Sequence, residues 1–432
     1  MKVKPYRFYY GWVIVAVSFL TLFFSLGIRY SFGVFFIAIL NEYGWGRAET
    51  AGAFSLAMIV HALFSPFSGY LIDRLGPRKL FPMGAILLIM GLVAVGRTTA
   101  IWHLYVFFGI VIAIGVNTLS YSPHMSIILK WFNRRRGFVM GLTLSGVGVG
   151  AMVIVPLAEL MIDTAGWRNA FLLLASLVLC IVFPMTLILQ RRSPEEVGQY
   201  PDGVIPQYQE DLSDQKVEFK GDITFSNMPK TWTLSEAMQT KAFWYIILAF
   251  FSNGFVSNML LVHQAVHVVD MGYSKFLAAS LVGSVGLIMS LSGIFWGFLS
   301  DRIGREITFT LGGCAAIIGI LLFLLISDAT SQWMLYAFVI LYGLGIGSTG
   351  LMTAAAIGDL FPGSSLGRIM AIQVMGFGIG GAFGPYLAGY FHDHTGSYLI
   401  PFTLLLVSIS VGIISIWIAA PRHRVSISTK QS

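Results

Sequence analysis

The sequence predicts an all-α membrane protein of twelve transmembrane helices, arranged as two six-helix bundles in a pseudo-two-fold repeat. Hydrophobic residues make up 56% of the 432 positions and charged residues only 11%, whereas a soluble domain carries about 25% charged residues. Apolar runs of ~20 residues, enough to span a bilayer as a helix, recur along the chain, and the short alternating segments of a β-barrel are absent. Motifs of the first half also return in the second half.

Each half of the chain contains six apolar segments of spanning length. The first six segments are 9–40, 49–73, 79–97, 100–130, 137–161 and 167–189. The other six are 242–270, 275–301, 306–327, 331–361, 366–392 and 396–420. The predicted units are therefore an N-terminal bundle at 1–190, a solvated linker at 191–241 and a C-terminal bundle at 242–432. Within the linker, Thr233 precedes Glu236 by three residues, the spacing of a helix capping box.

The placement of charged residues predicts how the chain is oriented in the membrane and argues against a nucleic-acid-binding protein. Lys and Arg concentrate at the termini, in alternate short loops and in the linker, so by the positive-inside rule both termini are cytoplasmic. The net charge of +7 forms no basic face of the kind that binds nucleic acid. Cys180 and Cys314 both lie in apolar runs, which predicts neither a disulfide nor a metal site, and no cofactor is expected. The first apolar segment is too long for a signal peptide, so we expect a multi-pass protein of the cytoplasmic (inner) membrane.

A repeated loop follows the second helix of each half. GYLIDRLGPRKLF at 69–81 recurs as GFLSDRIGREITF at 297–309, which places Asp73 and Arg74 in register with Asp301 and Arg302. An aspartate can accept hydrogen bonds at a helix N-terminus, and an arginine can pair with a carboxylate. We expect these four residues to form a gate that joins the two bundles on the cytoplasmic side. Internal symmetry of this kind is typical of transporters whose site lies near the membrane midplane.

The paired DR-x-G loops and the six-plus-six layout resemble the major facilitator superfamily. Finer features are similar to the branch that holds monocarboxylate transporters and oxalate–formate antiporters: YYGWVIV, SFGVFF, YGWGRAE, RRSPEEVGQYPDG and TWTLSEAMQTKAFW. The resemblance implies the major facilitator fold and alternating access. It also implies that helices one, four, seven and ten line the cavity, often with a proton gradient as the coupling force.

Polar residues on the fourth and seventh helices are candidates for substrate contact. Asn117, Tyr121 and His124 at i, i+4 and i+7 would share one face of a continuous helix, and we expect Asn117 and Tyr121 to orient a substrate. Packing between helices is the alternative role for such groups. His263 and His267 lie in HQAVH, without a third metal ligand, so no metal site is predicted.

Histidine titrates near neutral pH and could therefore carry a coupling proton. His263 is the main candidate, because it resembles a helix-seven histidine that the branch uses near the substrate. His267 lies closer to the surface beside Asp270, and His61 in the second helix is a further candidate.

Arg29 is the one fixed cation placed deep in the membrane. It has no acidic residue along its own helix before Glu42, and an arginine at mid-bilayer costs roughly 2.5–3.5 kcal/mol even on lenient scales. The branch is expected to place an arginine in helix eight, and its oxalate–formate members a lysine in helix eleven; here both are absent, and helix eleven offers only Gln373. Because an uncompensated buried charge is strongly unfavourable, we expect Arg29 to face a cavity that a carboxylate can enter. Pairing with helix-end carbonyls, or snorkelling to the surface, is the alternative.

The sequence therefore predicts a secondary transporter of a small organic monocarboxylate such as lactate or pyruvate, coupled to protons and acting as a monomer in the lipid bilayer. Arg29, Asn117, Tyr121 and His263 would contact the substrate, and His263, His267 or His61 would carry the proton. The alternatives are an exchanger of organic anions, a carrier of another metabolite, and a transporter-like sensor. No soluble catalytic domain is present, so an enzyme is not expected.

Overall fold

The computed structural model describes residues 8–133, 135–203, 232–326, 332–363 and 365–419. Throughout this part of the chain the regular structure is helical, and it contains twelve helical segments long and apolar enough to cross a membrane. The predicted fold class is therefore confirmed, with span ends close to those expected. The N-terminal lysines, the C-terminal tail and most of the predicted linker lie outside the described residues.

Several of the twelve spans consist of more than one helical segment. The first half contains α1 (Gly11–Tyr30), α2 (Phe32–Tyr43), α3 (Arg47–Leu75), α4 (Pro77–Val95), α5 (Ile101–Val106), η1 (Phe107–Ile112), α6 (Ala113–Thr118), α7 (Tyr121–Trp131), α8 (Arg136–Ala165), α9 (Trp167–Leu177), η2 (Val178–Val182) and α10 (Phe183–Ile188). The second half contains α11 (Leu234–Met238), α12 (Lys241–Asp270), α13 (Lys275–Ile303), α14 (Arg305–Leu324), α15 (Gln332–Leu360), α16 (Leu366–Thr395) and α17 (Leu399–Ala419). The segments η1 and η2 are π-helical turns.

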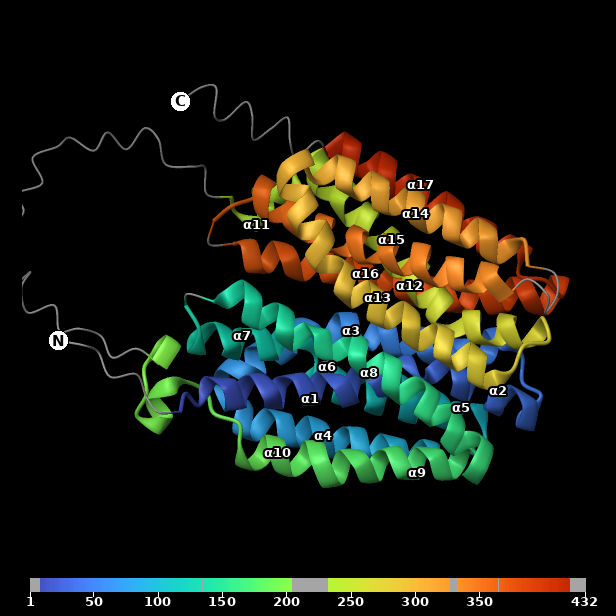
Figure 1. Ribbon diagram of the computed structural model, residues 1–432, viewed down its shortest axis with the longest axis horizontal. Helices are drawn as coiled ribbons and strands as arrows, with labels where there is room; N and C mark the ends of the chain where they lie inside the picture. The colour runs from blue at the N-terminus through green and yellow to red at the C-terminus, as the bar shows by residue number, and fades with distance from the viewer. Residues whose placement is uncertain (1–7, 134, 204–231, 327–331, 364, 420–432) are drawn as a thin grey trace, which may run out of the picture.

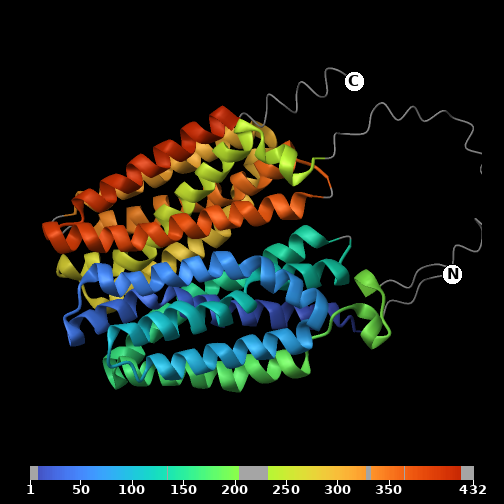
Figure 2. The same cartoon turned by 180° about the vertical axis from the view of Figure 1, so that it is seen from behind.

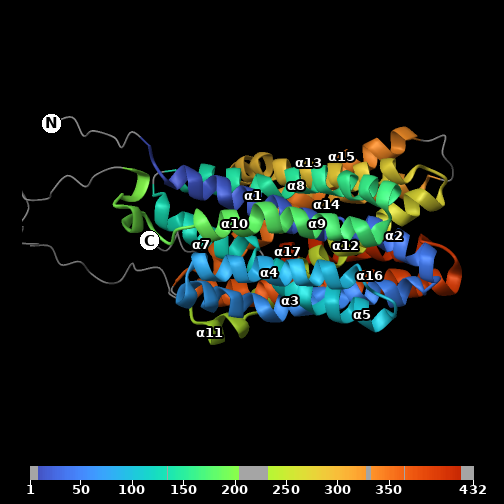
Figure 3. The same cartoon turned by 90° about the horizontal axis from the view of Figure 1, so that it is seen from below.

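The helices form two bundles that lie side by side along the long axis of the molecule. Helices α1–α10 make the lower bundle and α12–α17 the upper bundle in Figure 1, and the view from behind shows the same division (Figure 2). The bundles touch through α3 with α16, α8 with α13, and α2 with α12. Seen from below, the helices of both bundles run nearly parallel (Figure 3).

Glycine stripes allow the closest helix contacts inside each bundle. A Cβ atom at Gly150 of α8 would lie 2.2 Å from the Phe23 carbonyl oxygen of α1, and one at Gly380 of α16 would lie 2.1 Å from the Phe251 carbonyl oxygen of α12. The same contact thus recurs in both halves, as the internal repeat predicts. Small residues let helix backbones approach in membranes, and Gly150 belongs to the run GVGVGA at 146–151, so this run serves helix packing.

The bundles are in contact near one end of the molecule and separated near the other. We call the end where α2 finishes the Tyr43 side and the end where α1 begins the Gly11 side. On α16, Cβ atoms at Gly389 and Gly378 would collide with Ala48 and Ala62 of α3, whereas one at Gly367, on the same stripe but nearer the Gly11 side, would meet nothing within 4 Å.

Helices α8 and α13 follow the same pattern. A Cβ atom at Gly148 would meet Ser290 of the other bundle, but one at Gly141 or Gly137 would meet nothing within 4 Å. These positions share one helix face, so the two bundles diverge toward the Gly11 side, in agreement with the wedge between their ribbons in Figures 1 and 2.

Two segments near the Gly11 side have defined structure. The start of the predicted linker packs on the first bundle: Gln199 Oε1 accepts a hydrogen bond from the Tyr10 backbone N–H at 2.9 Å, and Asp202 accepts one from the Asn133 N–H at 3.1 Å. The capping box is confirmed, because the Thr233 side chain accepts from the Glu236 N–H and Glu236 Oε2 accepts from the Thr233 N–H at 2.9 Å.

Candidate functional site

Arg29 lies in the last turn of α1, in the middle of the molecule and between the two bundles. Its Nη2 donates to Asn258 Oδ1 of α12 at 3.1 Å and contacts Met58 Sδ of α3 at 3.1 Å. Its Nε is buried without a partner, and its guanidinium carbon lies 5.9 Å from the centre of the Phe54 ring. Arg29 is in none of the ion pairs formed within the described part of the chain. The cation thus has one neutral oxygen and one weakly accepting sulfur as partners.

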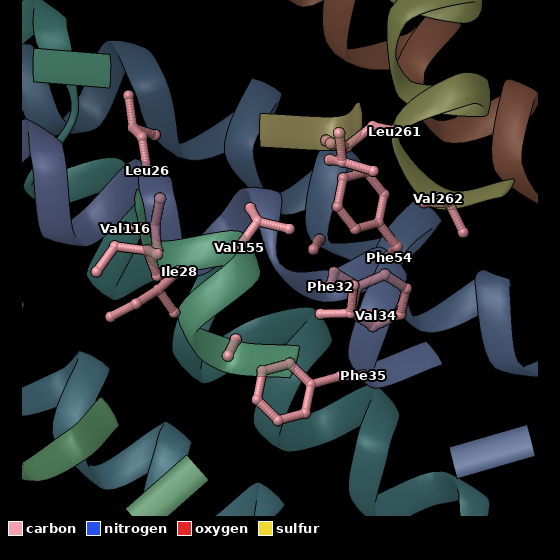
Figure 4. Packing of buried hydrophobic residues seen from close by; sticks show 14 of the residues in the cluster. Leu26, Ile28, Phe32, Val34, Phe35, Phe54, Val116, Val155, Leu261 and Val262 are labelled. Atoms are coloured by element: carbon pink, nitrogen blue, oxygen red, sulfur yellow. The ribbon is translucent and has the colours of Figure 1, made fainter. Parts of the chain in front are cut away.

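The surroundings of Arg29 are mostly apolar. Figure 4 shows buried hydrophobic side chains of α1, α2, α3 and α12 in this region, and Phe32 and Phe54 lie with their ring centres 5.2 Å apart. These contacts belong to one continuous hydrophobic cluster that includes Leu261 and Val262 of α12. Because the local dielectric is low in such an environment, an anion that reached Arg29 would bind it more strongly than in water.

A small cavity beside Arg29 is lined by His61. Arg29, Met58 and His61 border this cavity of about 10 Å³, which is room for one water molecule. The Asn117 amide donates to the His61 carbonyl oxygen at 3.0 Å and lies 3.1 Å from its Nδ1. An amide N–H next to Nδ1 favours the neutral tautomer that carries its hydrogen on Nε2. The structure thus brings Arg29 and His61 together and links Asn117 to them through His61.

The shared face expected for Asn117, Tyr121 and His124 does not form, so that prediction was wrong. Helix α6 ends at Thr118, and Ser120 is extended (φ −77°, ψ 176°) before α7 begins. Pro123 favours this break, because it lacks the backbone N–H that would bond to the carbonyl oxygen of the residue four positions earlier. Asn117 and His124 are therefore fully buried, whereas Tyr121 is 43% exposed.

His263 and His267 lie away from Arg29, near the Tyr43 side. Both ring nitrogens of His263 have partners, since Nδ1 lies 3.0 Å from the Tyr398 hydroxyl and Nε2 lies 2.9 Å from the Pro385 carbonyl oxygen. His267 packs against the rings of Tyr398 and Phe402, with ring centres 5.1 and 5.0 Å away. In this conformation both histidines belong to the closed end of the molecule.

A group of ionic and hydrogen-bonded contacts, which we call the Tyr43-side latch, joins the bundles at that end. Arg47 of α3 forms a two-point ion pair with Asp270 of α12, at 2.7 and 3.1 Å, and its Nη1 also donates to the Tyr398 hydroxyl at 2.7 Å. Asp393 of α16 accepts the backbone N–H groups of Arg47 and Ala48 at 3.0 and 2.8 Å. No side chain of α3 itself caps this helix start, so Asp393 supplies the cap from the opposite bundle.

Tyr398 connects the latch to His263. Burial raises the pKa of the Tyr398 phenol, so this hydroxyl stays protonated and accepts from Arg47 while it donates to His263 Nδ1. With Nδ1 accepting, Nε2 carries the hydrogen that the Pro385 carbonyl accepts. The partners of Arg47 are far away in the chain, so no local sequence pattern identifies these contacts.

The four predicted gate residues lie on the Gly11 side. Arg74 donates to Tyr70, Arg302 lies over the Phe298 ring, and Asp301 pairs with Arg305 at 2.8 Å. Each of these contacts stays within its own bundle. This agrees with the separation of the bundles at that side.

The chemistry available at the centre is anion binding. No group of three or more His, Cys, Asp or Glu residues that could hold a metal ion occurs within the described residues. Arg29 instead offers N–H groups without protein partners, close to a neutral histidine and an asparagine. The guanidinium fork matches a carboxylate in geometry and charge.

Comparisons with known proteins concern the family and the fold of the chain. A family model described as Major Facilitator Superfamily matches residues 18–353 and 290–431. The chain is 25% identical to "Monocarboxylate transporter 12" of Rattus norvegicus, over 98% of this chain and 89% of that protein. It is also 25% identical to "Monocarboxylate transporter 11" of Homo sapiens, over 96% and 83%. Among solved structures, a bacterial homolog of the human lysosomal transporter Spinster, inward-facing and unoccupied, matches with a TM-score of 0.66 and 15% identity over 95% of each chain, a likeness of fold.

Proposed function

The chain belongs to the Major Facilitator Superfamily, and from that premise we propose that it carries a small organic monocarboxylate, of the lactate or pyruvate kind, across the cytoplasmic membrane together with a proton. Its relatives named monocarboxylate transporters support the substrate class. The observation that carries the proposal is Arg29, a central cation without an acidic partner among the described residues.

The carboxylate would bind Arg29 in the space between the bundles. A carboxylate brings an opposite charge and can accept two N–H groups of the guanidinium at once, so it is a better partner than the neutral Asn258 amide oxygen. The N–H groups of Arg29 that lack a protein partner are available for this contact. We expect Tyr121, whose side chain is exposed, to contact the substrate on its way from the Gly11 side.

Alternating access follows from the unequal contacts at the two ends. By the positive-inside rule the Gly11 side faces the cytoplasm, so this conformation is open to the inside and the Tyr43-side latch is the outer gate. During the cycle the latch would separate and the bundles would meet on the Gly11 side. There Asp73, Arg74, Asp301 and Arg302 would form the inner gate.

His61 is the best placed of the three histidines to carry the proton. It borders the same cavity as Arg29, whereas both nitrogens of His263 are engaged near the outer gate. A protonated His61 and Arg29 would repel each other. A carboxylate between them would offset that repulsion, so binding of the anion would favour uptake of the proton.

Uptake of radiolabelled pyruvate into proteoliposomes tests the proposal. We expect acid outside to stimulate uptake by the unmodified protein. Arg29→Ala should abolish uptake while the purified protein stays folded and monodisperse, and Arg29→Lys, which keeps the charge without the fork, should retain only part of it. Full uptake by Arg29→Ala would overturn the proposal. Counterflow without a pH gradient separates symport from the alternative, exchange of organic anions.

A further inference from the structure

We infer that Asn258 is an internal competitor of the substrate: in the empty protein its side-chain oxygen holds Arg29, and a carboxylate must displace it to bind. This inference rests on the proposed function, because it requires that Arg29 is the anion site. It assigns to Asn258 a role in setting substrate affinity and in preventing the empty site from holding an unpartnered cation.

The Asn258 amide is oriented for this role by its own hydrogen bonds. Its Nδ2 donates to the Gly254 carbonyl oxygen, one helical turn earlier, at 2.9 Å, and Oδ1 accepts from Arg29 Nη2 at 3.1 Å. A flipped amide would bring two donors and two acceptors face to face, so the orientation is determined by both contacts. Asn258 is only 2% exposed, which leaves its oxygen no other described polar partner than Arg29.

Gly381 leaves room for the Asn258 amide because it has no side chain. A Cβ atom at Gly381 of α16 would lie 2.7 Å from Asn258 Nδ2 and 3.4 Å from Met58 Cγ. Any larger residue at this position would displace the amide or the thioether that contact Arg29. The contact between Arg29 and Asn258 also joins α1 of one bundle to α12 of the other, so a ligand that breaks it acts directly on the interface between them.

The affinity for substrate then depends on a difference between two interaction free energies, that of Arg29 with the carboxylate and that of Arg29 with the Asn258 oxygen. A neutral amide oxygen is a weaker partner than a carboxylate, so the substrate displaces it, but part of the binding energy is lost in doing so. Removal of the amide should therefore strengthen binding. Replacement of the amide by a fixed carboxylate should weaken binding strongly, because Arg29 would already be paired.

Isothermal titration of the purified protein with sodium pyruvate tests this inference. Hydrogen bonds to charged groups are strong enough that we expect Asn258→Ala to lower the Kd on the order of tenfold. Asn258→Asp should raise the Kd by at least the same factor. The matched control is Asn253→Ala, since Asn253 is a buried asparagine of the same helix that bonds to Thr349; its Kd should stay unchanged. Circular dichroism and thermal unfolding show which variants are folded.

The outcomes separate the inference from the proposed function. An unchanged or higher Kd in folded Asn258→Ala would overturn the inference, and so would unimpaired binding by Asn258→Asp. If Arg29→Ala binds pyruvate as the unmodified protein does, or if the unmodified protein binds no pyruvate, the proposed function fails. If Arg29→Ala loses binding while Asn258→Ala does not gain it, only the inference fails.

Discussion

Removal of the Asp393 carboxylate should shift the protein toward conformations that are open on the Tyr43 side. Asp393 accepts the backbone N–H groups of Arg47 and Ala48 across the bundle interface. Loss of a helix cap costs about 0.5–2 kcal/mol. Because Asp393 caps α3 only while the bundles are in contact, its removal destabilises the conformation closed on the Tyr43 side and leaves the open conformation unaffected. A difference of about 0.5–2 kcal/mol changes a population ratio about 2- to 30-fold. The ion pair of Arg47 with Asp270, which is partly exposed at 19% and 38%, adds only about 0.2–1 kcal/mol.

Distances between spin labels on the two bundles measure this shift. Labels at Ala165 of α8 and Gln332 of α15, both exposed near the Tyr43 side, report its opening once Cys180 and Cys314 have been replaced by serine. Asp393→Ala should increase the population with the longer distance.

The control for this experiment is Glu49→Ala. Glu49 is an exposed acid in the first turn of the same helix, and its side chain makes no bond to the other bundle among the described residues. An unchanged distribution in Asp393→Ala, or an equal shift in Glu49→Ala, would refute the reasoning about the cap.

Three further predictions concern closure, coupling and the broken helix. A Cβ atom at Gly378 would lie 2.4 Å from Ala62 Cβ, so Gly378→Val should hold the Tyr43 side open in the same spin-label assay, and a normal distance distribution would count against this. His61→Gln should remove the stimulation of pyruvate uptake by external acid, whereas His263→Gln should keep it; the opposite result would assign the proton to His263. Pro123→Ala restores the missing N–H and should extend α6 into α7, which slower hydrogen exchange at residues 119–122 would report and unchanged exchange would contradict.

Much of the fold was predictable because membrane insertion requires long apolar helices and because the chain repeats its motifs. The depth of Arg29 in the membrane was also predictable, since this residue lies inside a long apolar run. The contact of Arg29 with Asn258 was not predictable. It depends on how far α1 and α12 are shifted relative to each other along the membrane normal, which their local sequences do not determine.

The break in helix four and the Tyr43-side latch were not predicted from the sequence either, each for a physical reason. The expected face on helix four assumed a continuous helix, but the chain is interrupted between α6 and α7, just before Pro123. The Tyr43-side latch combines Arg47 of the first bundle with Asp270, Asp393 and Tyr398 of the second. These partners are far from Arg47 in the chain, and it meets them only when the bundles close at that end. The predicted gate residues Asp73, Arg74, Asp301 and Arg302 belong to the opposite end, which is open in this conformation.

The most direct test of the central claim is the affinity of purified Arg29→Ala protein for pyruvate, measured by titration calorimetry beside the unmodified protein and Arg29→Lys. Two charge-assisted hydrogen bonds contribute about 1.5–3 kcal/mol each, and displacement of Asn258 takes back about 1.4 kcal/mol, the equivalent of tenfold in affinity. The alanine variant should therefore lose at least about 10-fold in affinity, and the lysine variant less. Equal affinity of folded Arg29→Ala and unmodified protein would contradict the assignment of Arg29 as the carboxylate site.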